Sequence, residues 1–99
     1  MKIRILTLAI DDLDIGRQFY EKQQIGLGNY FLDSLFSDID ALLLHAGIQQ
    51  KFFGYFRMLS ARFPFAIYYL IEGDEIQVWR VLDCRQNPDR TIRKLLRQD

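Results

Sequence analysis

The stretch RFPFAIYYLIEGDEIQVWRVLDCR, residues 62–85, decides the fold of this 99-residue chain. Two runs rich in aromatic and β-branched residues, FAIYYLI (65–71) and IQVWRVLDC (76–84), flank the segment EGDE (72–75). Such runs favour strands, and a central Gly-Asp pair favours a tight turn. The stretch therefore predicts an antiparallel β-hairpin that carries one arginine, Arg80, among its apolar residues.

The segment before this hairpin predicts a third strand. KFFGYFRMLSARF, residues 51–63, is rich in aromatic residues, and we interpret it as one strand with a bend near Gly54. Pro64 favours extended geometry at Phe63, because a proline disfavours helical backbone in the residue before it. Three consecutive strands joined in this way form an antiparallel meander.

The first half of the chain carries helical periodicity. In YFLDSLFSDIDALLLHAG, residues 30–47, apolar residues recur at helical spacing and aspartates take the other side. One stripe consists of Phe31, Leu35, Ile39 and Leu42, and a second set that widens it consists of Leu32, Phe36 and Leu43. Gly47 is predicted to end this helix.

A shorter helix is expected before the long one. Asp11 or Asp12 is predicted to cap it, and its apolar face is predicted to contain Ile15 and Phe19, with Gln23 next in line. Gly26 and Gly28 would then end this helix and Asn29 would cap the next one. Two helices joined by a short glycine-rich turn predict an antiparallel helical hairpin.

Both ends of the chain also have a predicted structure. The alternating segment IRILTLAI, residues 3–10, predicts a first strand. Near the other end, NPD (87–89) predicts the start of a last helix, since proline suits a first turn. This last helix has a weak apolar side of Ile92, Leu95 and Leu96 among the basic residues Arg90, Arg93, Lys94 and Arg97.

This order of elements predicts an α+β, two-layer domain over residues 1–99. It has an N-terminal strand, an antiparallel helical hairpin, a three-stranded antiparallel meander and a short C-terminal helix. The first strand must return to the sheet across the helices. The length suits one domain, and with 49% hydrophobic residues the chain can build a core of its own.

Charge and composition bear on the partners and the cellular location of the protein. The net charge is zero, but residues 1–50 carry −3 and residues 51–99 carry +3. The basic half is either an ordinary solvated surface or a face for a nucleic acid or an acidic partner. The single cysteine, Cys84, fits a reducing cytoplasm, and no apolar run reaches the roughly 18–20 residues of a membrane span. We expect a cytoplasmic protein without a membrane partner.

Three segments resemble the RelE/ParE toxin superfamily of bacterial type II toxin–antitoxin systems, and look most like its ParE-type, plasmid-stabilisation branch. They are FYEKQQIGLGNYFLDSL (19–35), ARFPFAIYY (61–69) and IQVWRVLDCRQNPDR (76–90). The resemblance implies a small cytoplasmic toxin that a cognate antitoxin holds inactive by wrapping its groove. RelE-like toxins are ribosome-dependent mRNA endonucleases, whereas ParE-like toxins are associated with the poisoning of DNA gyrase.

The chain has only part of the residue set that the ribonucleases of this superfamily tend to have. Metal-free RNA cleavage needs a base, a cation for the phosphate and an acid for the leaving oxygen. The resemblance matches Arg85 to a late arginine, but Phe65 stands where these ribonucleases tend to have an arginine, and Asp83 where a histidine is common. No tyrosine follows Arg85. Arg85, acting with Arg62 or Arg80, is therefore a catalytic candidate only if the chain is a ribonuclease.

Arg80 is the first candidate for contact with a target or an antitoxin. Regular alternation places it on one face with Val78 and Leu82, and burying an unpaired arginine under helices would be costly. We expect this face to be open, away from the helical hairpin. The alternative is a local salt bridge, for instance to Glu72 or Asp83.

Arg57, Arg62 and Arg85 complete the set of candidate target or antitoxin contacts. Arg57 and Arg62 are five residues apart, so on one regular strand they would face opposite sides, and at most one would lie near Arg80. His45, the only histidine, lacks a second ligand at helical spacing, and Cys84 is interpreted as a small core residue. We expect no metal, no cofactor and no small-molecule substrate.

Three functions remain open at this point. The first is a ParE-like toxin that binds a macromolecular target, with DNA gyrase implied by the resemblance, and carries out no covalent chemistry. The second is an mRNA endonuclease of the RelE type, acting on the ribosome without a metal. The third is a degenerate, non-toxic member that only binds an antitoxin.

Overall fold

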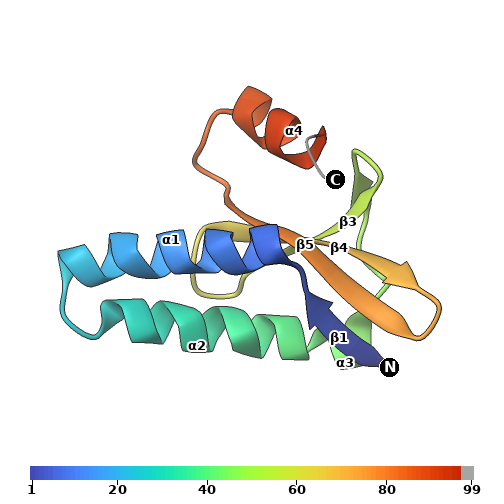
Figure 1. Cartoon of the computed structure of the whole chain (residues 1–99), viewed down its shortest axis with the longest axis horizontal. Coiled ribbons are helices and arrows are strands. Elements are labelled where there is room, and N and C mark those ends of the chain that lie inside the picture. The colour runs from blue at the N-terminus through green and yellow to red at the C-terminus, as the bar shows by residue number, and fades with distance from the viewer. Residues whose placement is uncertain (97–99) are drawn as a thin grey trace.

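A computed structural model describes residues 1–96 as a sheet with helices on both faces (Figure 1). Its elements are β1 (Lys2–Ile5), α1 (Thr7–Gln23), α2 (Leu27–Asp40), α3 (Leu42–His45), β2 (Lys51–Phe52), β3 (Tyr55–Leu59), β4 (Phe65–Glu72), β5 (Glu75–Asp83) and α4 (Pro88–Leu96). α1 and α2 lie side by side on one face, and α4 lies over the other. The predicted α+β order of strand, helical hairpin, meander and C-terminal helix is confirmed.

The sheet has five strands in the order β1-β5-β4-β3-β2. β3, β4 and β5 form the predicted antiparallel meander, and β1 returns across the helices to pair parallel with β5. The prediction of one strand over residues 51–63 was wrong, because Phe53 and Gly54 turn the chain between β2 and β3. Both residues have positive φ, 53° and 87°, which is the geometry of a two-residue hairpin turn.

The first strand is shorter than the alternating sequence predicted. β1 ends at Ile5, Leu6 is the N-cap, and α1 begins at Thr7, so neither Asp11 nor Asp12 is the cap. The apolar residues within 6–10 fit the period of a strand and the period of a helix equally well. Which of the two structures forms depends on burial against the sheet. The side of α1 that is buried contains Ala9, Leu13, Gly16 and Tyr20, whereas Ile15 and Phe19 are 67% and 49% exposed. The predicted apolar face of this helix was therefore wrong.

The stripe predicted for the long helix is confirmed. Phe31, Leu35, Ile39 and Leu42 are all buried, although the helix is divided into α2 and α3 at Ala41. The widening set was only partly right: Leu32 is half-buried, but Phe36 and Leu43 are exposed. The four stripe residues belong to the same core cluster as Ala9 and Leu13 of α1, so the long helix buries one side against α1 and the core.

Two glycines set the distance between α1 and α2. A Cβ on Gly16 would lie 2.6 Å from the Phe31 ring, and one on Gly28 would lie 2.7 Å from the Arg17 carbonyl oxygen. Gly28 is therefore a packing residue inside α2, not the end of α1 that we predicted. Gly26 makes the turn with a φ of 89° as N-cap of α2, and Asn29 lies within the helix.

A β-bulge in β5 changes which residues face the helices. Tyr68 of β4 pairs with Arg80 and Tyr69 pairs with Val78, so Trp79 has no partner of its own on β4. Val78 and Val81 both lie in the core under α1 and α2 as a result. Leu82 packs on the opposite face with Leu95 of α4. The prediction that Arg80 shares one face with Val78 was therefore wrong, because the bulge interrupts the alternation between them.

Candidate functional site

Arg80 is tied to α1 and α4 instead of lying on an open face. Its Nε and Nη2 donate to the two carboxylate oxygens of Asp12 at 2.7 and 2.8 Å, and its Nη1 donates to the Lys94 carbonyl at 3.3 Å. The Arg80 side chain is only 11% exposed and Asp12 is 8% exposed. Both the predicted exposure and the suggested partners Glu72 and Asp83 were wrong.

Asp12 also completes the edge of the sheet beyond the end of β1. Its Oδ2 accepts a hydrogen bond of 3.0 Å from the backbone N–H of Val81, just after the bulge. β1 pairs with β5 only as far as Val78, so Asp12 takes the place of a neighbouring strand at this point. One carboxylate thus fixes α1, the bulge and Arg80 together.

Arg85 lies at the end of β5, where it binds Asp83 and meets α1. Its side chain makes hydrogen bonds of 2.8 and 3.0 Å to Asp83 and one of 3.3 Å to the Tyr20 hydroxyl. Its guanidinium carbon lies 6.0 Å from the centre of the Phe19 ring. The side chain is 54% exposed, so Arg85 remains available to a partner, although a carboxylate already accompanies it.

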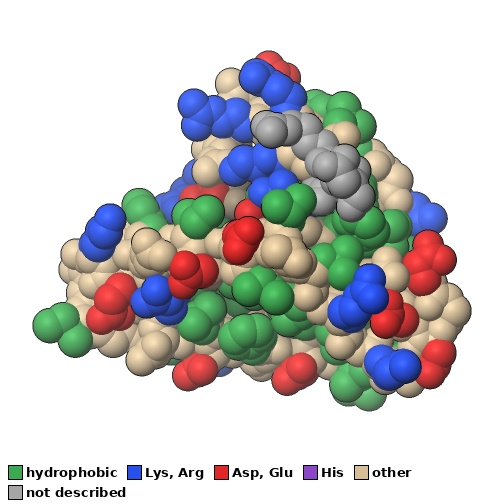
Figure 2. Space-filling view, viewed as in Figure 1, with side chains coloured by type: hydrophobic (Ala, Val, Ile, Leu, Met, Phe, Trp, Pro, Cys, Tyr) green, Lys and Arg blue, Asp and Glu red, His purple; other side chains and the backbone are tan. Residues whose placement is uncertain are grey.

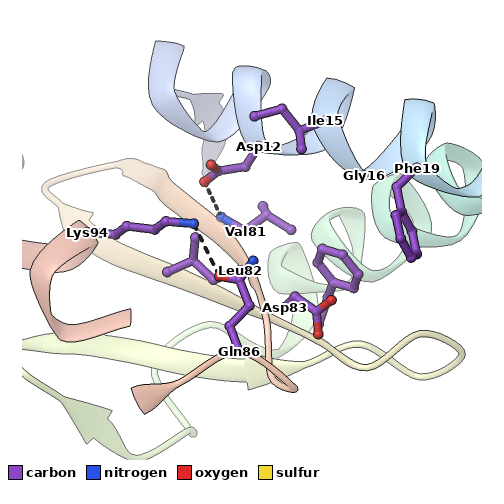
Figure 3. Close-up of a pocket in the computed structure, with 10 residues that line it drawn as sticks. Asp12, Ile15, Gly16, Phe19, Val81, Leu82, Asp83, Gln86 and Lys94 are labelled. Carbon is purple, nitrogen blue, oxygen red and sulfur yellow. Dashed lines mark hydrogen bonds between the residues drawn. The ribbon is translucent and has the colours of Figure 1, made fainter. Parts of the chain in front are cut away.

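A cleft of about 190 Å³ opens between α1 and α4, and we call it the α1–α4 cleft (Figure 3). Its lining residues are Asp12, Ile15, Gly16, Phe19, Phe65, Val81, Leu82, Asp83, Gln86 and Lys94. Ile15 and Phe19 project from α1 on one side, while Lys94 reaches from α4 to Gln86 on the other, at 3.2 Å. The cleft combines apolar walls with a rim of paired charges.

The α1–α4 cleft is suited to binding. Its three titratable side chains already have hydrogen-bond partners: Asp12 accepts from Arg80, Asp83 accepts from Arg85, and Lys94 donates to Gln86. A general base must reach the proton that it removes, and both carboxylates are held in place by their arginines. The apolar walls instead match an apolar side chain of a partner molecule.

Arg57 lies on the same face as Arg80, and Tyr68 stands between them. Arg57 pairs across the sheet with Tyr68, which in turn pairs with Arg80. Arg62 lies outside β3 in the exposed loop before β4, so the prediction that the two arginines occupy opposite faces of one strand does not apply. The structure therefore separates the four candidate arginines into one largely buried anchor (Arg80), two more exposed residues (Arg57 and Arg85) and one loop residue (Arg62).

Cys84 is exposed, because it follows the end of β5, so its interpretation as a core residue was wrong. Within residues 1–96 no three His, Cys, Asp or Glu side chains come together as a metal site. The described part of the chain also has no helix long and apolar enough to cross a membrane.

The surface carries the charge asymmetry seen in the sequence. Figure 2 shows basic side chains gathered over α4, above the boundary with α1, and green apolar side chains exposed along the helical hairpin. Arg90 and Arg93 are exposed on α4 and have no carboxylate within salt-bridge distance among the described residues. This end of the molecule can therefore attract an acidic partner.

Neither a protein-family model nor a curated protein sequence matches the chain. A solved structure described as "Chromosomal ParDE TA system from P. aeruginosa" matches with a TM-score of 0.71. This chain has the fold of that ParDE-system protein. The match covers 82% of this chain and 92% of the other, at 22% sequence identity. The ParDE-like fold confirms the fold that the resemblance implied.

Sequence reasoning missed Asp12 and Lys94, which line the α1–α4 cleft, and Tyr20, whose hydroxyl accepts a hydrogen bond from Arg85. Asp12 was interpreted as a helix cap, yet it lies three residues after Ala9 on the buried side of α1. An acidic residue on a buried helix face and an arginine inside an apolar strand are each costly alone. Together they were a signal for an ion pair.

The Asp83–Arg85 pair predicts a dependence of stability on pH. The hydrogen bonds from Arg85 lower the pKa of the Asp83 carboxyl, so the folded state holds this proton less tightly than the unfolded state. Its stabilisation is full above the unfolded-state pKa of about 4 and is lost as the pH falls through the lower folded-state pKa. Denaturant midpoints measured between pH 2 and 6 should show a weaker acid dependence in Asp83→Asn than in the parent chain.

Asp14→Asn is the matched control for this experiment. Arg17 also lowers the pKa of Asp14, but that pair lies within one exposed turn of α1 and is screened by water. An Asp83→Asn profile that overlays the parent would show that the pair contributes nothing to stability.

Proposed function

We propose that this chain is the ParE-like toxin component of a bacterial type II toxin–antitoxin system. It acts in the cytoplasm by binding a macromolecular target, DNA gyrase being the target that the sequence resemblance implies. A cognate antitoxin neutralises it by occupying the α1–α4 cleft. The observation that carries the proposal is the ParDE-like fold over 82% of the chain, which agrees with the toxin-like segments of the sequence.

The α1–α4 cleft supports the antitoxin part of the proposal. Ile15 and Phe19 are large apolar residues that remain 67% and 49% exposed at the cleft, although the helix has a separate buried face. Isolated exposed apolar residues need no explanation, but two on one wall of a cleft are suited to a protein partner. The basic side chains over α4 favour an acidic segment, and a disordered acidic tail that folds on binding has this character.

Binding is favoured over ribonuclease chemistry for a structural reason. Arg85 is the residue that the superfamily match offers for catalysis, and its guanidinium is held by Asp83. An adjacent carboxylate repels a phosphate and competes with it for the same donors. Asp12 and Asp83 are in turn occupied by arginines.

The proposal is tested by colony survival after tightly induced expression, with and without the neighbouring small gene. Loss of colonies that the neighbour restores is the expected result. Purified protein should then inhibit supercoiling by gyrase, and it should leave mRNA on translating ribosomes intact. Normal growth with soluble protein on a gel would overturn the toxin assignment and leave a non-toxic antitoxin-binding protein. mRNA cleavage that Arg85→Ala abolishes would establish the ribonuclease instead.

A pair of charge substitutions tests the cleft itself. Ile15→Glu places a carboxylate on the apolar wall and should weaken binding of the neighbouring gene product about tenfold or more, because an apolar anchor is lost and an acidic tail is repelled. Leu44→Glu is the matched control, since Leu44 is 84% exposed on α3 and does not line the α1–α4 cleft. If both variants bind the neighbouring gene product with equal affinity, the α1–α4 cleft is not part of the antitoxin interface.

A further inference from the structure

A second cleft, of about 240 Å³, lies on the other side of α4, and we call it the α4–hairpin cleft. The β2–β3 hairpin, the end of β5 and the first turns of α4 enclose it. The residues that line it are Phe52, Phe53, Arg57, Tyr68, Leu82, Asp83, Cys84, Gln86, Pro88, Thr91 and Ile92. Most of them are apolar or aromatic, and Arg57 is the only basic residue among them.

Arg57 differs from the other arginines near the sheet in having no anion. Arg80 and Arg85 bind carboxylates, whereas Arg57 has none within salt-bridge distance among residues 1–96. Its guanidinium lies 5.0 Å from the centre of the Phe52 ring, and Nη2 lies 3.8 Å from the sulfur of Cys84. A half-buried guanidinium held over a ring keeps unused donors and a positive charge in the cleft.

Phe53 presents an aromatic ring at the mouth of the same cleft. It is a non-glycine residue with positive φ (53°), which is rare for a bulky residue and carries a strain cost. Phe53 remains 55% exposed, so its ring gains only part of the burial that could offset this strain. A two-residue turn of this kind favours asparagine at this position, before glycine. Contact with a partner is a physical reason for a phenylalanine here.

The charges around the cleft favour one carboxylate over a chain of phosphates. Asp83 is already paired with Arg85, but Asp89 in the first turn of α4 has no cation within salt-bridge distance among residues 1–96, so a polyanion would meet an uncompensated negative group there. One carboxylate can bind Arg57 while an adjacent apolar side chain packs between Phe52, Phe53 and Ile92. We propose that the α4–hairpin cleft binds an extended peptide segment of a partner protein, through one large apolar side chain next to a carboxylate. The inference rests on the proposed function only in supplying a protein partner.

The test titrates ¹⁵N-labelled protein, made by cell-free synthesis to avoid toxicity, with three short peptides. The peptide acetyl-Glu-Phe-Glu-amide should shift the backbone amides of residues 52–57 and 84–92, with a dissociation constant on the order of 1 mM, as for a single anchor and one ion pair. Acetyl-Glu-Ala-Glu-amide should bind at least fivefold more weakly, and so should acetyl-Lys-Phe-Lys-amide. Shifts confined to the α1–α4 cleft, or no shifts at all, would overturn the proposal.

Two substitutions and one control assign the binding to the named residues. Arg57→Ala should weaken the acidic peptide about tenfold, because it removes a charge-assisted hydrogen bond. Phe53→Asn should weaken it similarly while raising the melting temperature by a few degrees, because asparagine suits the turn. Arg4→Ala removes an equal charge from β1, at the far edge of the sheet, and should change neither quantity.

The changes in melting temperature and peptide affinity caused by Phe53→Asn distinguish a binding role of the Phe53 ring from a structural one. A purely structural role for the ring would lower stability, and the peptide affinity of the folded protein would then be unchanged. A short single-stranded oligouridylate provides the competing class of ligand. If it shifts the same amides and the acidic peptide does not, the cleft binds nucleic acid and the peptide proposal fails. Colony survival does not enter this test, so its failure is distinct from failure of the toxin assignment.

Discussion

Replacing Arg80 with alanine is expected to lower the free energy of unfolding by about 3–5 kcal/mol, a large part of the roughly 5–15 kcal/mol typical of a small domain. The substitution leaves the Asp12 carboxylate buried, at 8% exposure, without its two guanidinium donors. It also removes the hydrogen bond to the Lys94 carbonyl that helps to hold α4. An uncompensated buried charge costs much more than an intact ion pair contributes.

Chemical denaturation followed by circular dichroism measures this effect. Arg17→Ala is the matched control, because the Arg17–Asp14 pair is exposed on α1, and it should change the midpoint little. The double variant Asp12→Asn/Arg80→Met removes both charges and keeps an acceptor for the Val81 N–H, so it should be more stable than Arg80→Ala alone. If Arg80→Ala is no more destabilising than Arg17→Ala, the buried pair is not the anchor described above.

Truncation of Phe31 to alanine is expected to destabilise the chain by a similar amount, about 3–5 kcal/mol. Phe31 is fully buried, and its ring centre lies 4.9–5.2 Å from those of Tyr20, Phe63 and Phe65. This aromatic cluster joins α1, α2 and β4 below the α1–α4 cleft. Its loss therefore leaves a cavity at the point where the helical hairpin meets the sheet.

Gly16 lies against the Phe31 ring, so the effects of substituting these two residues on stability should depend on each other. Gly16→Ala alone should cost about 1–3 kcal/mol, because its Cβ would lie 2.6 Å from Cζ of Phe31. In the Phe31→Ala background the same methyl group enters the cavity and improves helix propensity, so it should stabilise the chain. A double-mutant cycle measures this reversal of sign. Additive effects would show that α1 and α2 shift apart instead of closing on the ring.

The elements with one unambiguous pattern were predictable from the sequence. β4, β5 and α4 lie where strand propensity, the Gly-Asp turn and Pro88 placed them, and the stripe from Phe31 to Leu42 is buried as its spacing indicated. Residues 6–10 were assigned wrongly because an apolar run of that length fits a strand or a helix equally well. The face of α1 was missed for a related reason, since Ile15 and Phe19 also have helical spacing.

The sites depended on contacts between residues far apart in the chain, and local pattern does not specify these. Asp12 and Arg80 are 68 residues apart, and a bulge that no local signal marked brings Arg80 toward α1 and α4. The strained turn at Phe53 and the unpaired charge of Arg57 are likewise visible only when the hairpin, β5 and α4 lie together. The sequence by itself determined the class of fold, because periodicity and turn chemistry are local properties. The tertiary structure decided which charges are neutralised and which remain available, because that depends on burial and on partners brought together by folding.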